Sequence, residues 1–198
     1  MIEYELLTRM LSRDFLSPNQ RMMEEPKQAG THTCTIVDKG VDHYKSYRYD
    51  LEERDFLPFF NKEYDDEERG VVTDNPTPTG LLKFCDYILL ATVNEKLYVV
   101  LVEMKSGNNA GANQQLDASE TFIDYVKASA ERIQALCGYE DYDSGNIILR
   151  RVLLKPAPKI RPATNIGRRN SQIDWGADPI VLNSQLFPLL KVCELHQR

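Results

Sequence analysis

Three charged residues have the types and spacing of a metal-dependent hydrolytic centre. Asp86 lies near the start of a β-rich run, 84–93, and Glu103 and Lys105 lie at the end of a second run, 97–105. Carboxylates hold hard divalent cations, and a nearby ammonium group can act on a water molecule or a phosphate. The pattern predicts a site only if the chain folds these residues together.

A β-hairpin would bring them together. Alternate residues of a strand point to opposite faces, so Glu103 and Lys105 share one face and Met104 faces the other way. A two-residue loop at 94–95 places Asp86 directly opposite Glu103. A three-residue loop places Asp86 opposite Met104 instead, so in both cases Asp86 ends within one residue of Glu103.

Two opposed carboxylates beside a buried strand call for a cation. Side chains in such a pair have Cβ atoms roughly 4.5–5.5 Å apart, and like charges at that spacing are destabilising. Lys105 is one candidate cation and a bound Mg²⁺ or Mn²⁺ is another. A metal, a water positioned by Lys105 and a phosphate together permit phosphodiester hydrolysis. The alternative is a purely structural ion pair of Lys105 with two acids.

The elements around the hairpin predict an α/β fold, with a central mixed β-sheet flanked by helices in one domain. Apolar spacing and turn residues place them as follows: a helix over 3–15, two short strands within 33–50, the hairpin strands, a long helix after 111, a strand over 146–154, a short strand over 179–183 and a terminal helix.

The residues of the hairpin and of the helix after it also carry a family likeness. The stretches 83–88 (KFCDYI), 100–106 (VLVEMKS) and 112–116 (ANQQL) resemble the PD-(D/E)xK nuclease superfamily, in a form common among small bacterial nucleases. The resemblance implies a restriction-endonuclease-like core within a single nuclease-like domain, 1–198. The catalytic core would span about 80–155, with an N-terminal extension over about 1–30.

The resemblance also implies a role for each site residue. Asp86 and Glu103 would be metal ligands, the Met104 carbonyl would be a third, and Lys105 would position the attacking water. Gln115 matches a glutamine that many relatives place near the site. The cofactor would be Mg²⁺ or Mn²⁺.

Three features leave alternatives open. Gln114 precedes Gln115 and is a second candidate for the same role. A cysteine, Cys85, stands before Asp86 where the family pattern has proline. Relatives often add a glutamate from the first core helix, for which four residues are eligible, the last of them less so: Glu52, Glu53, Glu63 and Glu5.

A basic segment is the candidate nucleic-acid surface. Residues 146–170 contain no acid and carry Arg150, Arg151, Lys155, Lys159, Arg161, Arg168 and Arg169, which suit the neutralisation of backbone phosphates. Arg150 and Arg151 are adjacent in a strand, so only one of them can face the site. Alternatively, the segment is a solubilising loop that pairs with the acidic stretch 50–69.

Net charge and cysteine content limit the class of protein further. The net charge of −6 argues against a protein that coats nucleic acid through bulk charge. Four scattered cysteines predict free thiols in a reducing cytosol, and no secretory signal is visible, so we expect a cytoplasmic protein. The first hypothesis is a Mg²⁺-dependent endonuclease acting on DNA in restriction or phage defence, as a homodimer or with a partner subunit of a defence complex. The second is a catalytically silent nuclease fold that binds nucleic acid or a partner protein.

Overall fold

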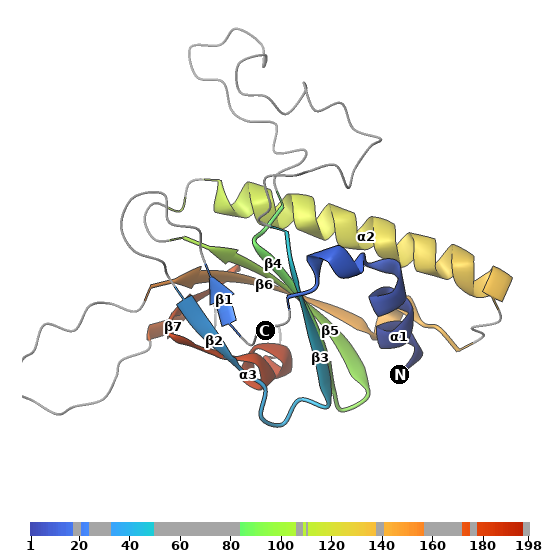
Figure 1. Cartoon of the computed structure of the whole chain (residues 1–198), viewed down its shortest axis with the longest axis horizontal. Coiled ribbons are helices and arrows are strands. Elements are labelled where there is room, and N and C mark those ends of the chain that lie inside the picture. Colours follow the sequence, from blue (N-terminus) through green and yellow to red (C-terminus); the bar gives the residue numbers. More distant parts are fainter. Residues whose placement is uncertain are drawn as a thin grey trace, which may run out of the picture.

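A mixed sheet forms the centre of the computed structural model (Figure 1). It has six strands in the order β3-β4-β5-β6-β8-β7. The structure describes residues 1–17, 21–23, 33–49, 84–105, 109, 111–137, 141–156, 172–174 and 178–195. Strands β5, β6 and β8 are parallel to one another, and the remaining neighbours are antiparallel. The prediction of a mixed sheet flanked by helices is therefore confirmed.

Apart from β7, which was not predicted, the elements of this sheet and its helices follow the predicted order, with these bounds: α1 Ile2–Met10, β3 His43–Arg48, β4 Tyr87–Val93, β5 Lys96–Met104, α2 Ala112–Cys137, β6 Ile147–Lys155, β7 Gln172–Asp174, β8 Ile180–Asn183 and α3 Leu189–Glu194. Helix α1 is shorter than the predicted 3–15. Leu11 adopts an extended conformation that ends the helix, and Ser12 caps a separate 3-10 turn, Arg13–Phe15.

A second, three-stranded sheet was not predicted. It has the order β1-β2-β9, with bounds Arg21–Met23, Thr33–Val37 and Leu186–Pro188. The two short strands predicted within 33–50 are present as β2 and β3, but they lie in different sheets.

Two apolar layers hold the central sheet. On one face, α1 and α2 pack on β4 and β5 through buried residues such as Leu7, Leu116 and Ile123. On the other face, the small sheet and α3 pack on the same strands through residues such as Phe187 and Val192. Strand β5 is buried along its length after Lys96, which explains its nearly continuous apolar sequence. None of the described helices is long and apolar enough to cross a membrane.

Candidate active site

The β4–β5 hairpin sets the position of both acids. Val93 pairs with Lys96, and the register continues without a bulge to Tyr87 opposite Val102. The connecting residues 94–95 both have positive φ, 50° and 60°, as a tight two-residue hairpin turn requires. The two-residue-loop alternative is therefore confirmed, and the next rung of the ladder places Asp86 opposite Glu103.

Both carboxylates lie in the interior. Asp86 is 9% exposed and Glu103 is 1% exposed. Glu103 is on the face covered by α2, because Leu101, two residues earlier, belongs to the core on that face. Met104 belongs to the core on the opposite face, so the predicted alternation along β5 is confirmed. Burial of two acids costs considerable solvation free energy unless cations or hydrogen-bond donors compensate it.

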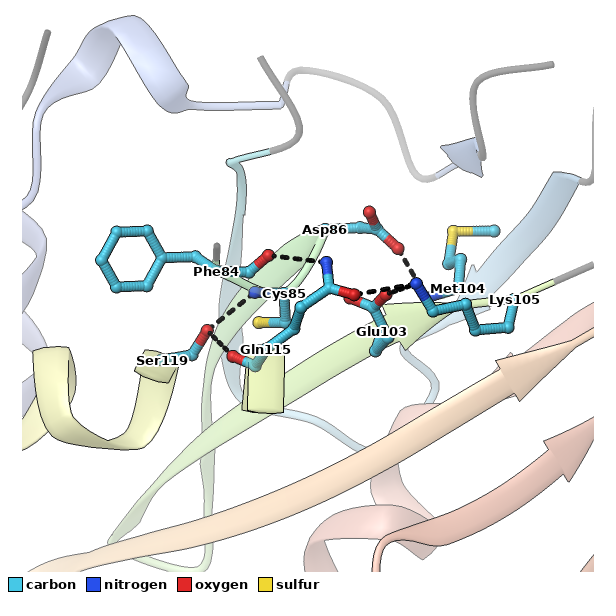
Figure 2. A network of polar contacts seen from close by, with 8 residues as sticks. All are labelled: Phe84, Cys85, Asp86, Glu103, Met104, Lys105, Gln115 and Ser119. Carbon is cyan, nitrogen blue, oxygen red and sulfur yellow. Dashed lines mark hydrogen bonds and ion pairs between the residues drawn. The ribbon is translucent and has the colours of Figure 1, made fainter. Parts of the chain in front are cut away.

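Lys105 supplies one such cation. Its Nζ lies 2.6 Å from Glu103 Oε1 and donates a second hydrogen bond, 2.8 Å long, to Gln115 Oε1 (Figure 2). The Lys105 side chain is 24% exposed, so its ammonium group lies at the boundary between the interior and solvent. The sequence placed Lys105 and Glu103 on one face, and the structure brings their charges into direct contact.

Asp86 is held differently. Its Oδ2 accepts a 2.5 Å hydrogen bond from the Met104 N–H, and its backbone carbonyl accepts one of 2.9 Å from the Tyr49 N–H. The carboxylate is thus directed toward the end of β5, just before Lys105 (Figure 2). Main-chain donors from Tyr49, directly after β3, and from Met104 at the end of β5 therefore orient Asp86, the residue directly before β4.

The structure distinguishes the two glutamines. Gln115 Oε1 accepts from Lys105, and Gln115 Nε2 donates a 3.2 Å hydrogen bond to the Phe84 carbonyl. Because one partner is an ammonium group and the other is a carbonyl, the amide orientation is determined. Gln114 is exposed and lines a neighbouring cavity of about 370 Å³, together with Leu153 and Val181. Gln115 is the residue that joins α2 to the site.

The sequence interpretation missed Ser119. This buried serine lies one turn after Gln115 on α2, and its hydroxyl group accepts a 2.8 Å hydrogen bond from the Cys85 N–H. The only sequence signal was a polar residue on the apolar side of the helix. Cys85 itself is buried as a free thiol. Burial is the main cause that raises its pKa well above the ordinary value, and the carboxylates of Glu103 and Asp86 add to the effect. Cys85 is therefore a packing residue, not a nucleophile.

The donor set fits a magnesium-type ion with few protein ligands. Asp86 and Glu103 offer hard oxygen atoms at one strand end, where the Met104 carbonyl also lies, and Mg²⁺ commonly keeps several water ligands. Among the described residues there is no group of three or more His, Cys, Asp or Glu that could hold a metal. The eligible upstream residues Glu52, Glu53 and Glu63 lie outside the described residues, and Glu5 pairs with Arg9 on α1.

The basic residues of β6 have protein partners. Arg150 donates to the carbonyls of Cys193 and Leu195 at the C-terminal end of α3, at 3.4 and 2.6 Å. Its guanidinium group lies 5.7 Å from the centre of the Tyr98 ring. Neither the direction nor the partners of this side chain suit a role at the site.

Arg151 is on the α2 face, the same face as Glu103, and contacts three acids: Asp117 at 2.8 Å, Glu120 at 3.6 Å and Asp178 at 3.7 Å. The expectation that only one of the two arginines faces the side of the site is met. Lys155 ends β6 and is partly exposed. The other predicted phosphate contacts, Lys159, Arg161, Arg168 and Arg169, lie outside the described residues.

Comparisons with models of protein families, with curated proteins and with solved structures found no match. Any functional conclusion therefore depends on the geometry of the site and on its chemistry.

Proposed function

We propose that the chain is a divalent-metal-dependent nuclease whose centre is formed by Asp86, Glu103, Lys105 and Gln115. The observation that carries the proposal is the placement of the Lys105 ammonium group between a buried carboxylate and a helix-borne amide, 2.6 and 2.8 Å away. A second carboxylate, Asp86, lies on the next rung of the same hairpin. Two carboxylates that could bind a metal and one ammonium group therefore lie at the same end of the β4–β5 hairpin.

The fold supports the proposal through its connectivity. In the central sheet and the helices on its α2 face, the order along the chain is α1, the antiparallel strands β3, β4 and β5, the crossover helix α2 and the parallel strand β6; β1 and β2, between α1 and β3, belong to the small sheet. We propose that this unit is a restriction-endonuclease-like core. It presents the acids at the strand ends, beside the first turn of the crossover helix, where α/β folds commonly bind ligands.

The residues divide the proposed chemistry among them. Asp86, Glu103 and the Met104 carbonyl would hold the metal, which would stabilise charge on the phosphate and lower the pKa of a bound water. Lys105 orients the attacking water and the phosphate oxygens through its ammonium protons, and Gln115 fixes the direction of that ammonium group. The attacking water gives one proton to solvent as its oxygen bonds to phosphorus, the bond to the leaving sugar oxygen breaks, and the leaving oxygen takes up one proton from solvent.

The alternative is a catalytically silent nuclease fold that binds nucleic acid or a partner protein. One observation favours it: Lys105 already neutralises Glu103, which gives the pair a structural role without a metal. The same experiment separates the two functions, because tight binding of nucleic acid or of a partner without cleavage under any metal supports the silent module.

The direct test is a cleavage assay with plasmid, linear duplex and single-stranded DNA, each with Mg²⁺, Mn²⁺ or EDTA. We expect wild-type cleavage that EDTA abolishes and that Asp86→Ala and Lys105→Ala each reduce by at least about 100-fold. Gln114→Ala is the matched control, since Gln114 is next to Gln115 but is exposed and lines the neighbouring cavity. Cleavage that persists in both site variants would refute the assigned centre.

A further inference from the structure

Ser119 links the helix of the site to the strand of the site. Its side chain is fully buried, at 0% exposure. The hydroxyl group donates a 2.8 Å hydrogen bond to the Gln115 carbonyl, one turn earlier on α2. It also accepts a 2.8 Å hydrogen bond from the N–H of Cys85. A single oxygen atom therefore joins the residue that contacts Lys105 with the residue that precedes Asp86 (Figure 2).

The second link runs parallel to the first. Gln115 Nε2 donates to the carbonyl of Phe84, at 3.2 Å. The chain at 84–85 enters the sheet before β4 begins at Tyr87, so the strand ladder does not hold these two residues. Instead, α2 holds the carbonyl of one and the N–H of the other through side chains one helical turn apart. Asp86 follows directly, and its carboxylate accepts from the Met104 N–H.

We propose that Ser119 is a positioning residue of the site: its hydroxyl group, which donates to the main-chain carbonyl of Gln115, fixes the backbone at Cys85, directly before Asp86. Hydroxyl chemistry is required there because one group must donate to a helix carbonyl and accept from an N–H at the same time. Alanine would leave the buried Cys85 N–H without its acceptor, and the 84–86 segment would shift to recover one. This role rests on the proposed function.

The experiment compares Ser119→Ala, Ser119→Thr and Ser46→Ala. Threonine keeps the hydroxyl group. Ser46 on β3 is the matched control because it is also buried, at 3% exposure, and its hydroxyl group has no hydrogen-bond partner among the described residues. For each full-length variant, Mn²⁺ binding is measured by calorimetry without nucleic acid, and the Mn²⁺ concentration for half-maximal cleavage is measured with linear DNA.

Loss of a residue that orients metal ligands typically weakens metal affinity by about 10–100-fold. We expect Ser119→Ala to weaken Mn²⁺ binding about 10-fold and to raise the half-maximal concentration in parallel. Ser119→Thr should restore both values to within about threefold of wild type, and Ser46→Ala should leave both unchanged. A folded Ser119→Ala protein with wild-type metal affinity would overturn the proposal, as would an equal loss in Ser46→Ala.

Failure of the proposed function gives a different result. If wild type neither cleaves nucleic acid nor binds Mn²⁺, the nuclease proposal fails, and the positioning role is tested by amide hydrogen exchange. The Met104 N–H is the reporter, since it donates to the Asp86 carboxylate. Its exchange should become at least about 10-fold faster in Ser119→Ala and stay unchanged in Ser46→Ala. An unchanged Met104 amide in Ser119→Ala would refute the positioning role by itself.

Discussion

Removal of the Lys105 ammonium group tests the requirement of the site for a cation. In Lys105→Met the long apolar stem is kept, but Glu103, at 1% exposure, loses the ammonium group 2.6 Å away. Breaking a buried ion pair by removing one partner costs about 3–5 kcal/mol. Because Lys105 is 24% exposed and water partly screens its charge, we expect a loss at the lower end, about 3 kcal/mol in the free energy of unfolding.

A double-mutant cycle isolates the pair. Urea unfolding of wild type, Lys105→Met, Glu103→Gln and the double variant should give a coupling free energy of about 2 kcal/mol. The matched control is Arg9 with Glu5 on α1, an ion pair whose side chains are 61% and 51% exposed. That pair should show a coupling of at most about 0.5 kcal/mol.

Magnesium provides the decisive comparison. If a divalent ion can take the place of the ammonium group, Mg²⁺ should stabilise Lys105→Met more than wild type, in which Lys105 competes for Glu103. At 100 times the dissociation constant, the ion would add about 2.7 kcal/mol and so recover most of the loss. Equal stabilisation of the two proteins by Mg²⁺, or a coupling no larger than that of the α1 control pair, would refute the reasoning.

Three further predictions concern Gln115, Arg150 and Cys34. Gln115→Ala should lower the cleavage rate about 10-fold, while Gln114→Ala should change it less than twofold in the same assay. Equal effects of the two substitutions would contradict the role assigned to Gln115. Arg150→Met should lower the free energy of unfolding by about 2 kcal/mol, because two carbonyls at the end of α3 lose a charged donor. It should change DNA affinity less than threefold in a binding titration at fixed salt, and a larger loss would assign Arg150 to the DNA surface. Burial raises the pKa of Cys34 from 9.0 to about 12, so the folded state favours the protonated thiol. Its contribution to stability is therefore complete below pH 9 and should be lost at about 1.4 kcal/mol per pH unit as pH rises toward 12. Urea unfolding at pH 8 and pH 10 measures this slope, and an unchanged slope in Cys34→Ala would contradict it.

The geometry of the hairpin was predictable because it depends on local rules. Period-two alternation set the faces of β5, and the short connection at 94–95 restricted the register to two choices. One of these choices places Asp86 opposite Glu103, and the structure has it. Burial of β5 was also predictable, because a nearly continuous apolar sequence is typical of a strand that is covered on both faces.

The choice between Gln114 and Gln115 was not predictable in the same way. Adjacent residues on a helix point about 100° apart, so which of them faces the sheet depends on how α2 packs. The small sheet was not predictable from the sequence for a different reason. Strands β1 and β9 have three residues each, too few for an alternating pattern, and β9 pairs with β2 from the other end of the chain.

Arg150 and Arg151 show what a charge pattern leaves open. Adjacent strand residues point to opposite faces, so the two arginines contact the layers on opposite sides of the sheet. Arg150 donates to a carbonyl at the end of α3, and Arg151 forms ion pairs with Asp117 and Glu120 of α2. The sequence predicted that this basic pair contacts phosphates, but in the structure both side chains contact other parts of the protein. These contacts join residues far apart in the sequence, so no local sequence pattern predicts them.

Because Arg150 and Arg151 contact other protein groups, fewer basic residues can contact a nucleic acid. The Lys105 N–H donates to the carbonyl of Leu154, so β5 and β6 end side by side, and Lys155, the last residue of β6, lies at the same end of the sheet as the site. The basic residues from Lys159 to Arg169 follow in the sequence and lie outside the described residues. We therefore expect Lys105 and Lys155 to neutralise the phosphates on either side of a bound metal. Asp117 and Glu120, which contact Arg151, disfavour phosphate on the α2 flank, so a bound strand would cross the ends of β5 and β6.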